Sequence, residues 1–500
     1  MNPNRSSGVL LPIFSLPGDF GCGDFGKGAY AFIDLLKACG FHYWQVLPFT
    51  RTDDCNSPYK SDSAFAGNCN FIDLYDLQKM GLLQDIEIKA QLGTPDWRVS
   101  YDWLNKTRKP LLQKAFSRAD AALKADIAAF AQTQDWLSDY ALYMVLKDKF
   151  DCEWMHWEDK ALRDYEPQAI KTACETYQAQ MEYYFFEQYI FSRQWEKVKA
   201  YAHQNEVYII GDMPIYVSFE SADCWSKRSL FDLDEKGSPA SVAGVPPDYF
   251  SKTGQKWGNP LYNWSEMRKD SYQWWKQRLH HTLKMVDKVR IDHFRAFSAY
   301  WAVPAEAEFA TEGKWVDGEG MKFFDEIFKT VSKEAIIAED LGIQDAALTT
   351  LLKDSALPGM RVLQFGFLNY DDDMHLPHNY PHNMVCYTGT HDNKPLLAYL
   401  WELTPEQRAY CLRYCGFQGE DWKSGGAYNK AIRAILKTLW KSHSMLVISP
   451  IQDLLGYGGD TTMNQPGTSK GNWSFRMTPE AIHAIDITYL KNLNDLYKRS

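Results

Sequence analysis

Acidic residues end three apolar runs of the chain. Residues 288–292 (KVRID) end at Asp292, residues 335–339 (AIIAE) end at Glu339, and residues 384–392 (MVCYTGTHD) end at Asp392. Each run contains β-branched Val or Ile, which favour a strand. Carboxyl groups act as nucleophiles and as general acids or bases. Because the same arrangement occurs three times, we expect a shared chemical role rather than three unrelated surface acids.

Arg290 shares one face of the first run with Asp292, because the side chains of a strand alternate between its two faces. A carboxylate beside a guanidinium stays ionised, which suits a nucleophile that must not take up a proton. A structural ion pair at a strand end explains the same two residues equally well. The two other acidic runs favour the catalytic interpretation.

Eight strand-like runs alternate with mainly helical segments. The expected strands are 8–14, 41–48, 206–214, 288–295, 335–342, 360–366, 384–393 and 444–450. The expected helices include 29–38, 111–130, 136–150, 176–203, 271–285, 320–331 and 344–353. This alternation predicts the α/β class with a parallel (β/α)8 barrel, also called a TIM barrel. The three acids then lie at the carboxyl ends of strands four, five and seven, the face where such barrels carry their active sites.

Two long segments do not fit the barrel pattern. Residues 74–180 show helical periodicity without a barrel strand, and we interpret them as an inserted, mainly helical subdomain after the second strand. Residues 216–264, after the third strand, form an inserted active-site loop region with aromatic residues at its centre. Exposed aromatic side chains are costly unless they cover something. We therefore expect one catalytic barrel over residues 1–500 with a long substrate-covering loop.

Composition excludes several classes of protein. The net charge of −10 argues against nucleic acid as a partner, because a phosphate-binding surface needs an excess of basic residues. No apolar stretch approaches the length of a membrane span, and the short N-terminal apolar run does not form a signal peptide. The ten cysteines are scattered, which is typical of reduced thiols in the cytoplasm. We expect a cytoplasmic protein without a membrane partner; its oligomeric state stays open.

Several short motifs resemble those of the amylomaltases, the 4-α-glucanotransferases of glycoside hydrolase family 77. They are SLPG at 15–18, SPY at 57–59, SAFAGN at 63–68, GDMPIYV at 211–217, RIDHF at 290–294, AEDLG at 338–342, GTHDN at 389–393 and MNQPGT at 463–468. The resemblance extends from about Ser7 to Asn472. It implies transfer of α-1,4-glucan segments between maltooligosaccharides, starch or glycogen, without a metal or an organic cofactor.

The resemblance also implies a role for each acid: Asp292 is the nucleophile, Glu339 the acid/base residue and Asp392 the residue that stabilises the transition state. Periodicity does not separate Glu339 from Asp340, because adjacent strand residues face opposite ways, so the motif makes that choice. Glu339 has no cationic neighbour in its own strand and keeps its proton more easily. One ionised and one protonated carboxyl group are what a retaining glycosidase mechanism needs.

The same resemblance implies a set of substrate-binding side chains. These are Tyr59, Asp212, Asp248, Gln255, Trp257, Arg290, His391 and Asn464. The simpler interpretations are a turn that happens to contain Tyr59 and a loop that packs on the core.

Other functions stay open at this point. Histidines next to the acids, at positions 293 and 391, would also suit a metal-dependent amidohydrolase, although the loop after the first strand lacks the His-x-His pair typical of those barrels. A glucan-binding protein without catalysis would keep the fold. An α-amylase-like hydrolase would form the same intermediate and pass it to water instead of a sugar hydroxyl.

Overall fold

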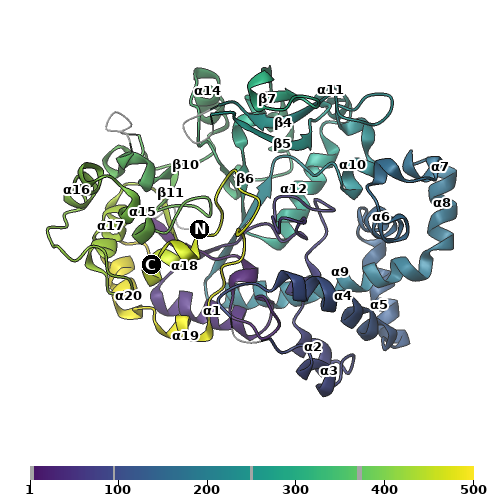
Figure 1. Cartoon of the computed structure of the whole chain (residues 1–500), viewed down its shortest axis with the longest axis horizontal. Coiled ribbons are helices and arrows are strands. Elements are labelled where there is room, and N and C mark those ends of the chain that lie inside the picture. The colour runs from purple at the N-terminus through teal and green to yellow at the C-terminus, as the bar shows by residue number, and fades with distance from the viewer. Residues whose placement is uncertain (1–4, 94–95, 248–251, 369–373) are drawn as a thin grey trace.

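The computed structural model describes residues 5–93, 96–247, 252–368 and 374–500. Within these residues, eight parallel strands form a nearly closed barrel in the order β10-β11-β12-β1-β2-β3-β6-β9 (Figure 1). The strands are β1 Ser6–Leu10, β2 Tyr43–Gln45, β3 Tyr208–Pro214, β6 Lys288–Asp292, β9 Ile336–Ala338, β10 Gly359–Val362, β11 Met384–Tyr387 and β12 Leu446–Pro450. The predicted (β/α)8 barrel is confirmed, and each expected run overlaps one of its strands.

The strands are shorter than the apolar runs that predicted them. The first run turns into a 3-10 helix at Ile13–Ser15, directly after Pro12. Proline has no backbone N–H to donate to a strand ladder, so the strand ends before it. Several apolar residues beyond the strands remain buried, among them Phe14, Leu47 and Leu363.

The parallel register aligns the ends of the central strands. Asp212 of β3 lies opposite Arg290 of β6, and Pro214 lies opposite Asp292. On the other side of β6, Ile291 lies opposite Ala338, the last residue of β9. The register therefore brings Asp212, Arg290, Asp292 and the start of the β9 loop to one end of the barrel.

Amphipathic helices cover the outside of the barrel. In α17, Lys430–Lys441, the residues Ile432, Ile435, Leu436 and Leu439 are buried, the spacing expected for one helix face. The other covering helices are α1 Lys27–Cys39, α12 Gln273–Met285, α13 Met321–Ile327, α14 Ala346–Ser355, α15 Leu396–Glu402, α16 Pro405–Tyr414, α18 Ile451–Leu455, α19 Pro479–His483 and α20 Ile487–Leu496. No helix in the described ranges has the length and apolar character needed to cross a bilayer.

The chain between β2 and β3 is helical, and in Figure 1 much of it projects to the right of the barrel. It contains α2 Leu74–Lys79, α3 Asp85–Lys89, α4 Tyr101–Ser117, α5 Ala121–Gln132, α6 Leu137–Phe150, α7 Lys160–Arg163, α8 Pro167–Thr176 and α9 Gln178–Gln204. Trp195 of α9 packs against the rings of Phe25 and Phe49, so this last helix returns to the barrel. The limits of a separate subdomain at residues 74 and 180 stay a prediction.

The single helix expected at 111–130 is wrong. The chain forms α4 and α5, and the break lies at residues 118–120. The Asp120 carboxylate accepts the backbone N–H of Leu123 at 2.8 Å and caps the start of α5. The apolar pattern continues across this break, which is why it suggested one helix.

A second, antiparallel sheet follows β3 and lies at the top of Figure 1. Its strands are β4 Ser241–Val245, β5 Gln255–Pro260, β7 Ala299–Pro304 and β8 Lys314–Asp317, in the order β5-β4-β7-β8. Part of the long segment interpreted as a loop is therefore a strand pair. Its many Gly and Pro residues concealed this from the sequence, and its partner β7 comes from beyond the loop.

Candidate active site

A cleft of about 690 Å³ opens at the carboxyl ends of the barrel strands. Its lining includes seven of the predicted site residues, which are Tyr59, Gln255, Trp257, Asp292, His391, Asp392 and Asn464. Three more predicted residues, Asp212, Arg290 and Glu339, are buried beside the cleft. Asp212 contacts Tyr59, Arg290 contacts Asp292, and Glu339 accepts the backbone N–H of His293, which also lines the cleft. Asp248 lies outside the described residues.

Arg290 joins two carboxylates at the base of the cleft. Its Nη1 donates to both oxygens of Asp212, at 2.8 and 2.9 Å, and its Nη2 lies 2.8 Å from Oδ1 of Asp292. Burial raises the pKa of Asp212, and the guanidinium opposes that shift. The Arg290 and Asp212 side chains are almost fully buried, whereas the Asp292 side chain is 31% exposed. Arg290 therefore fixes one oxygen of Asp292 while the residue stays open to the cleft.

Tyr59 connects Asp212 to His391. Its hydroxyl donates to Oδ2 of Asp212 at 2.9 Å and lies 2.9 Å from Nε2 of His391. Because the phenol proton is used on Asp212, this arrangement assigns a proton to Nε2 of His391, which donates to the phenol oxygen. Burial raises the pKa of Tyr59 well above its usual value, so the hydroxyl keeps its proton.

Asn464 holds Asp392 in a position next to His391. The amide nitrogen of Asn464 donates to its Oδ1 at 2.6 Å, and Nε2 of His391 lies 3.4 Å from its Oδ2. The backbone N–H of Asn464 also donates to the carbonyl of His391 at 3.1 Å. The segment around Asn464 is thereby attached to the loop that follows β11. The Asp392 side chain is 42% exposed, and it lines the cleft.

Glu339 is buried next to the end of β6. Its Oε2 accepts the backbone N–H of His293 at 2.7 Å, and its Oε1 accepts that of Leu341 at 2.7 Å. Burial raises the pKa of Glu339 to about 8; Asp292 adds to this shift, while Arg290 and the two N–H groups oppose it. A carboxyl group with this pKa is mostly protonated at pH 7, as a general acid must be.

Asp340 points away from this group. Its Oδ1 accepts the backbone N–H of Met360 at 2.6 Å, and its Oδ2 lies 3.0 Å from Nη1 of Arg361. It therefore links β9 to β10, whereas Glu339 contacts the residue after Asp292. The alternation of side chains left both acids as candidates for the acid/base residue. In the structure, Glu339 faces the end of β6 and Asp340 faces β10.

Strand β5 contributes one wall of the cleft. Gln255, Trp257 and Asn259 alternate along the strand and all line the cleft. The indole N–H of Trp257 donates to Oε1 of Gln255 at 3.2 Å, and its ring meets the His293 ring edge-on at 4.8 Å. The predicted pair therefore sits on a strand of the second sheet, beside the end of β6.

Sequence reasoning missed Trp473. Its ring centroid lies 5.6 Å from that of Tyr59 and 5.8 Å from that of His391, so it completes an aromatic wall of the cleft. The available signal was an aromatic residue directly after Gly471 and Asn472, close to the MNQPGT motif. Asp53, Cys55 and Lys60 also line the cleft, and nothing in their spacing indicated this. Among the described residues, no three His, Cys, Asp or Glu side chains are placed to hold a metal ion.

Comparison with known proteins identifies the family of this chain. Residues 11–482 match the 4-alpha-glucanotransferase model of glycoside hydrolase family 77. The 4-alpha-glucanotransferase of Streptococcus pneumoniae is 41% identical over 99% of this chain and 97% of its own, and that of Aquifex aeolicus is 39% identical over 99% of each. The solved amylomaltase of Streptococcus agalactiae, in complex with acarbose, superposes with a TM-score of 0.95 at 36% identity, covering 99% of this chain and all of that one. The chain therefore belongs to glycoside hydrolase family 77, the 4-α-glucanotransferases.

Proposed function

We propose that the protein moves α-1,4-glucan segments from a donor to the 4-hydroxyl of an acceptor glucan or glucose, with retention of configuration at C1. Asp292 is the nucleophile, Glu339 the acid/base residue and Asp392 the stabiliser of the transition state. The observation that carries this proposal is the pair of unlike carboxyl groups. Asp292 is bound to a guanidinium and open to the cleft, while burial holds the neighbouring Glu339 in its protonated form.

In the first step, a carboxylate oxygen of Asp292 attacks C1 of the donor. The bond from C1 to the glycosidic oxygen breaks, and that oxygen takes the proton of Glu339 as it leaves. The product is a covalent glycosyl ester on Asp292 and a shortened glucan. Asp212 orients the guanidinium of Arg290. Arg290 in turn holds the carboxylate of Asp292 in place for attack.

In the second step, Glu339 acts as the base. It takes the proton from the 4-hydroxyl of the acceptor, whose oxygen attacks C1 and displaces Asp292. Asp392, oriented by Asn464, holds sugar hydroxyls while positive charge develops at C1. Water in place of the acceptor would give hydrolysis, so the same residues serve both outcomes.

The wall residues suit a sugar chain. The rings of Tyr59 and Trp257 offer apolar surface to the C–H groups of glucose, and Gln255 and Asn464 offer amides to its hydroxyls. The related amylomaltase of known structure is in complex with acarbose. We infer that a maltooligosaccharide occupies the cleft of this protein.

Incubation of the pure protein with maltotriose tests the function. Transfer predicts glucose together with a ladder of maltooligosaccharides longer than the substrate, resolved by size. Products no longer than maltotriose would mean hydrolysis and would contradict the proposed transfer. The Asp292→Asn protein serves as the matched control for contaminating activity.

A further inference from the structure

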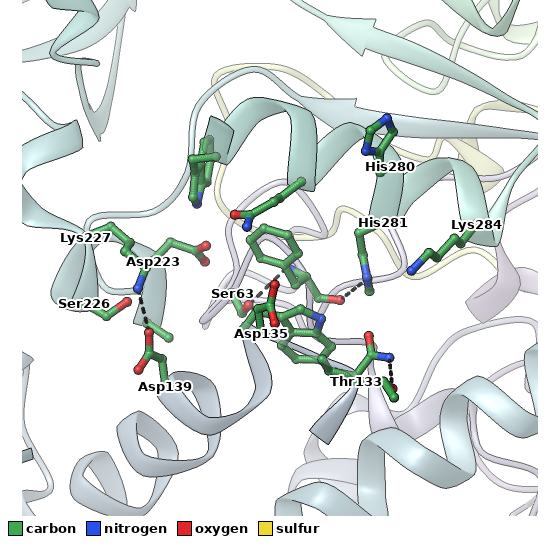
Figure 2. A pocket seen from close by; sticks show the side chains of 16 residues that line it. Ser63, Thr133, Asp135, Asp139, Asp223, Ser226, Lys227, His280, His281 and Lys284 are labelled. Carbon is green, nitrogen blue, oxygen red and sulfur yellow. Dashed lines mark hydrogen bonds and ion pairs between the residues drawn. The ribbon is translucent and has the colours of Figure 1, made fainter. Parts of the chain in front are cut away.

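A second pocket, with a volume of about 350 Å³, lies where the inserted helices meet the outside of the barrel (Figure 2). One side is α12, which contributes His281 and Lys284. The facing side is the connection from α5 to α6, with Thr133 and Asp135, and the third side is α10, Ala222–Ser226. Within the described chain, none of its lining residues also lines the active-site cleft. Its size is that of a small-molecule site.

Aromatic rings form much of the pocket lining. Trp136 stacks on Phe65 with ring planes 14° apart and centroids 5.9 Å apart. Trp274 meets Phe65 edge-on at 6.2 Å, and His281 meets Trp136 edge-on at 5.4 Å. Such mutually packed rings hold one another in place, so the pocket wall that they form is rigid before a ligand binds. The faces of pyranose rings carry C–H groups that pack on surfaces of this kind.

Polar side chains without internal partners surround these rings. Asp135, Ser226, Gln277 and Lys284 line the pocket, and within the described residues their side chains make no hydrogen bond or ion pair. An amide, a hydroxyl, a carboxylate and an ammonium group together offer both donors and acceptors. A ligand that carries several hydroxyl groups can use them all, because each hydroxyl both donates and accepts.

The pocket lining carries three carboxylates and two ammonium groups, a balance that disfavours an anionic ligand. Asp139 is paired with Lys227 at 3.0 Å, and Asp223 accepts the backbone N–H of Ala64 at 2.7 Å. Burial lowers the pKa of His281 to about 4, so this ring is neutral at pH 7. The remaining charges, Asp135 and Lys284, are of opposite sign. No excess of positive charge is present to bind a phosphate group.

We propose that this pocket is a second binding site for a neutral glucan, separate from the active-site cleft and about the size of a disaccharide. A glucose ring packs against the part of Trp136 that lines the pocket, and Gln277 and Ser226 bind its hydroxyls. The glucan identity of the ligand rests on the proposed function; the neutral, hydroxyl-rich class rests on the pocket itself. Because helix α12 and the insertion both line the pocket, a bound chain is held across their junction.

Calorimetric titration with maltotriose tests this in the full-length Asp292→Asn protein, in which turnover is suppressed. Two binding events are expected. Gln277→Trp, at an exposed position, places an indole in the pocket and should weaken one event by about tenfold or more. Gln273→Trp is the matched control, because it lies one turn earlier on α12 and does not line the pocket. Trp257→Ala, in the cleft, should weaken the other event.

The outcomes distinguish the two proposals. A single binding event that Trp257→Ala removes and Gln277→Trp leaves unchanged overturns the second site alone. No binding of maltotriose, together with no product ladder from the wild-type protein, overturns the glucan function and the second site together.

Hydrogen exchange gives a measurement without a pocket variant: maltotriose should protect residues 131–140 and 273–285 in the protein carrying Asp292→Asn and Trp257→Ala. Unchanged exchange in both segments contradicts the second site.

Discussion

The backbone N–H of His293 donates to the carboxyl group of Glu339 at 2.7 Å. His293 directly follows Asp292 in the chain, so the residue next to one proposed catalytic carboxyl holds the other. His293 has a φ of 53°, a left-handed conformation that is uncommon for residues other than glycine. This turn ends β6 and fixes the position of Glu339 relative to Asp292. A retaining mechanism depends on that separation.

Glu339→Gln should fail on maltotriose, because the departing sugar oxygen receives no proton. A glycosyl fluoride needs no such proton, so the variant should still form the covalent intermediate from it and accumulate that intermediate. Azide requires no base and should partly restore turnover, which is measured as glycosyl azide. Normal disproportionation of maltotriose by this variant would show that the acid lies elsewhere.

Asp340→Asn is the matched comparison for Glu339→Gln. Asp340 is buried against Arg361 and the N–H of Met360, so this change should lower thermal stability. Breaking a buried charged hydrogen bond costs about 1–3 kcal/mol. The folded fraction should retain acid catalysis and show no azide rescue. Rescue of Asp340→Asn instead would reverse the assignment of the two neighbouring acids.

Asp292→Asn should lower transfer from maltotriose by several orders of magnitude and leave the protein folded. Arg290 keeps its two bonds to Asp212 in this variant, so the buried cation stays paired. The measurement is the rate of glucose release, with circular dichroism as the check on folding. Near-normal activity would remove Asp292 from the role of nucleophile.

The pH profile should report the proton of Glu339. Its pKa of about 8 predicts that kcat/KM for maltotriose falls as the pH rises through that value, because the acid form is lost. Formation of the intermediate from a glycosyl fluoride should lack this fall. A maltotriose profile that stays level to pH 9 or so would contradict this role.

The folded-state pKa is above the ordinary value of 4.5, so the contribution of Glu339 to stability is complete below pH 4.5 and is lost as the pH rises through about 8.

Tyr59→Phe should lower both the stability of the protein and kcat without changing the charge of the active site. The change removes the hydroxyl from between Asp212 and His391 and leaves both with an unfilled hydrogen bond. We expect a loss of about 1–3 kcal/mol in the free energy of unfolding, measured by urea denaturation. A lower kcat should accompany it, because His391 no longer has a fixed position beside Asp392. If kcat and stability both stayed at wild-type values, Tyr59 would not position this network.

The sequence predicted the parts of the site that lie on regular strands. Alternation predicted Arg290 beside Asp292, and the structure contains that pair. Their position beside Asp212 depends on the register between β3 and β6, which the sequence alone did not predict. The contacts between Tyr59 and His391 could not be predicted this way, because loops from distant parts of the chain bring them together. Trp473 was missed for the same reason.

Local patterns also failed where pairing is non-local. Strand β5 carries Gln255 and Trp257, but its neighbour β4 pairs in turn with β7, which begins at Ala299, beyond the barrel strand β6. A window of sequence around the loop contains no sign of that partner. The break before Asp120 was missed because apolar periodicity continues across it, although the capping aspartate was visible.

The seam between β9 and β10 gives the barrel a weak point next to Glu339. In the described chain these two strands have no ladder of paired residues; they are joined by the N–H of Ala338 to the carbonyl of Pro358, at 2.9 Å, and by the carboxylate of Asp340. Segments with few such bonds open before the rest of a protein. Mild heating should therefore separate these two strands first and displace Glu339. Enzymatic activity should then be lost at a lower temperature than the helical signal in circular dichroism, and it should return on cooling.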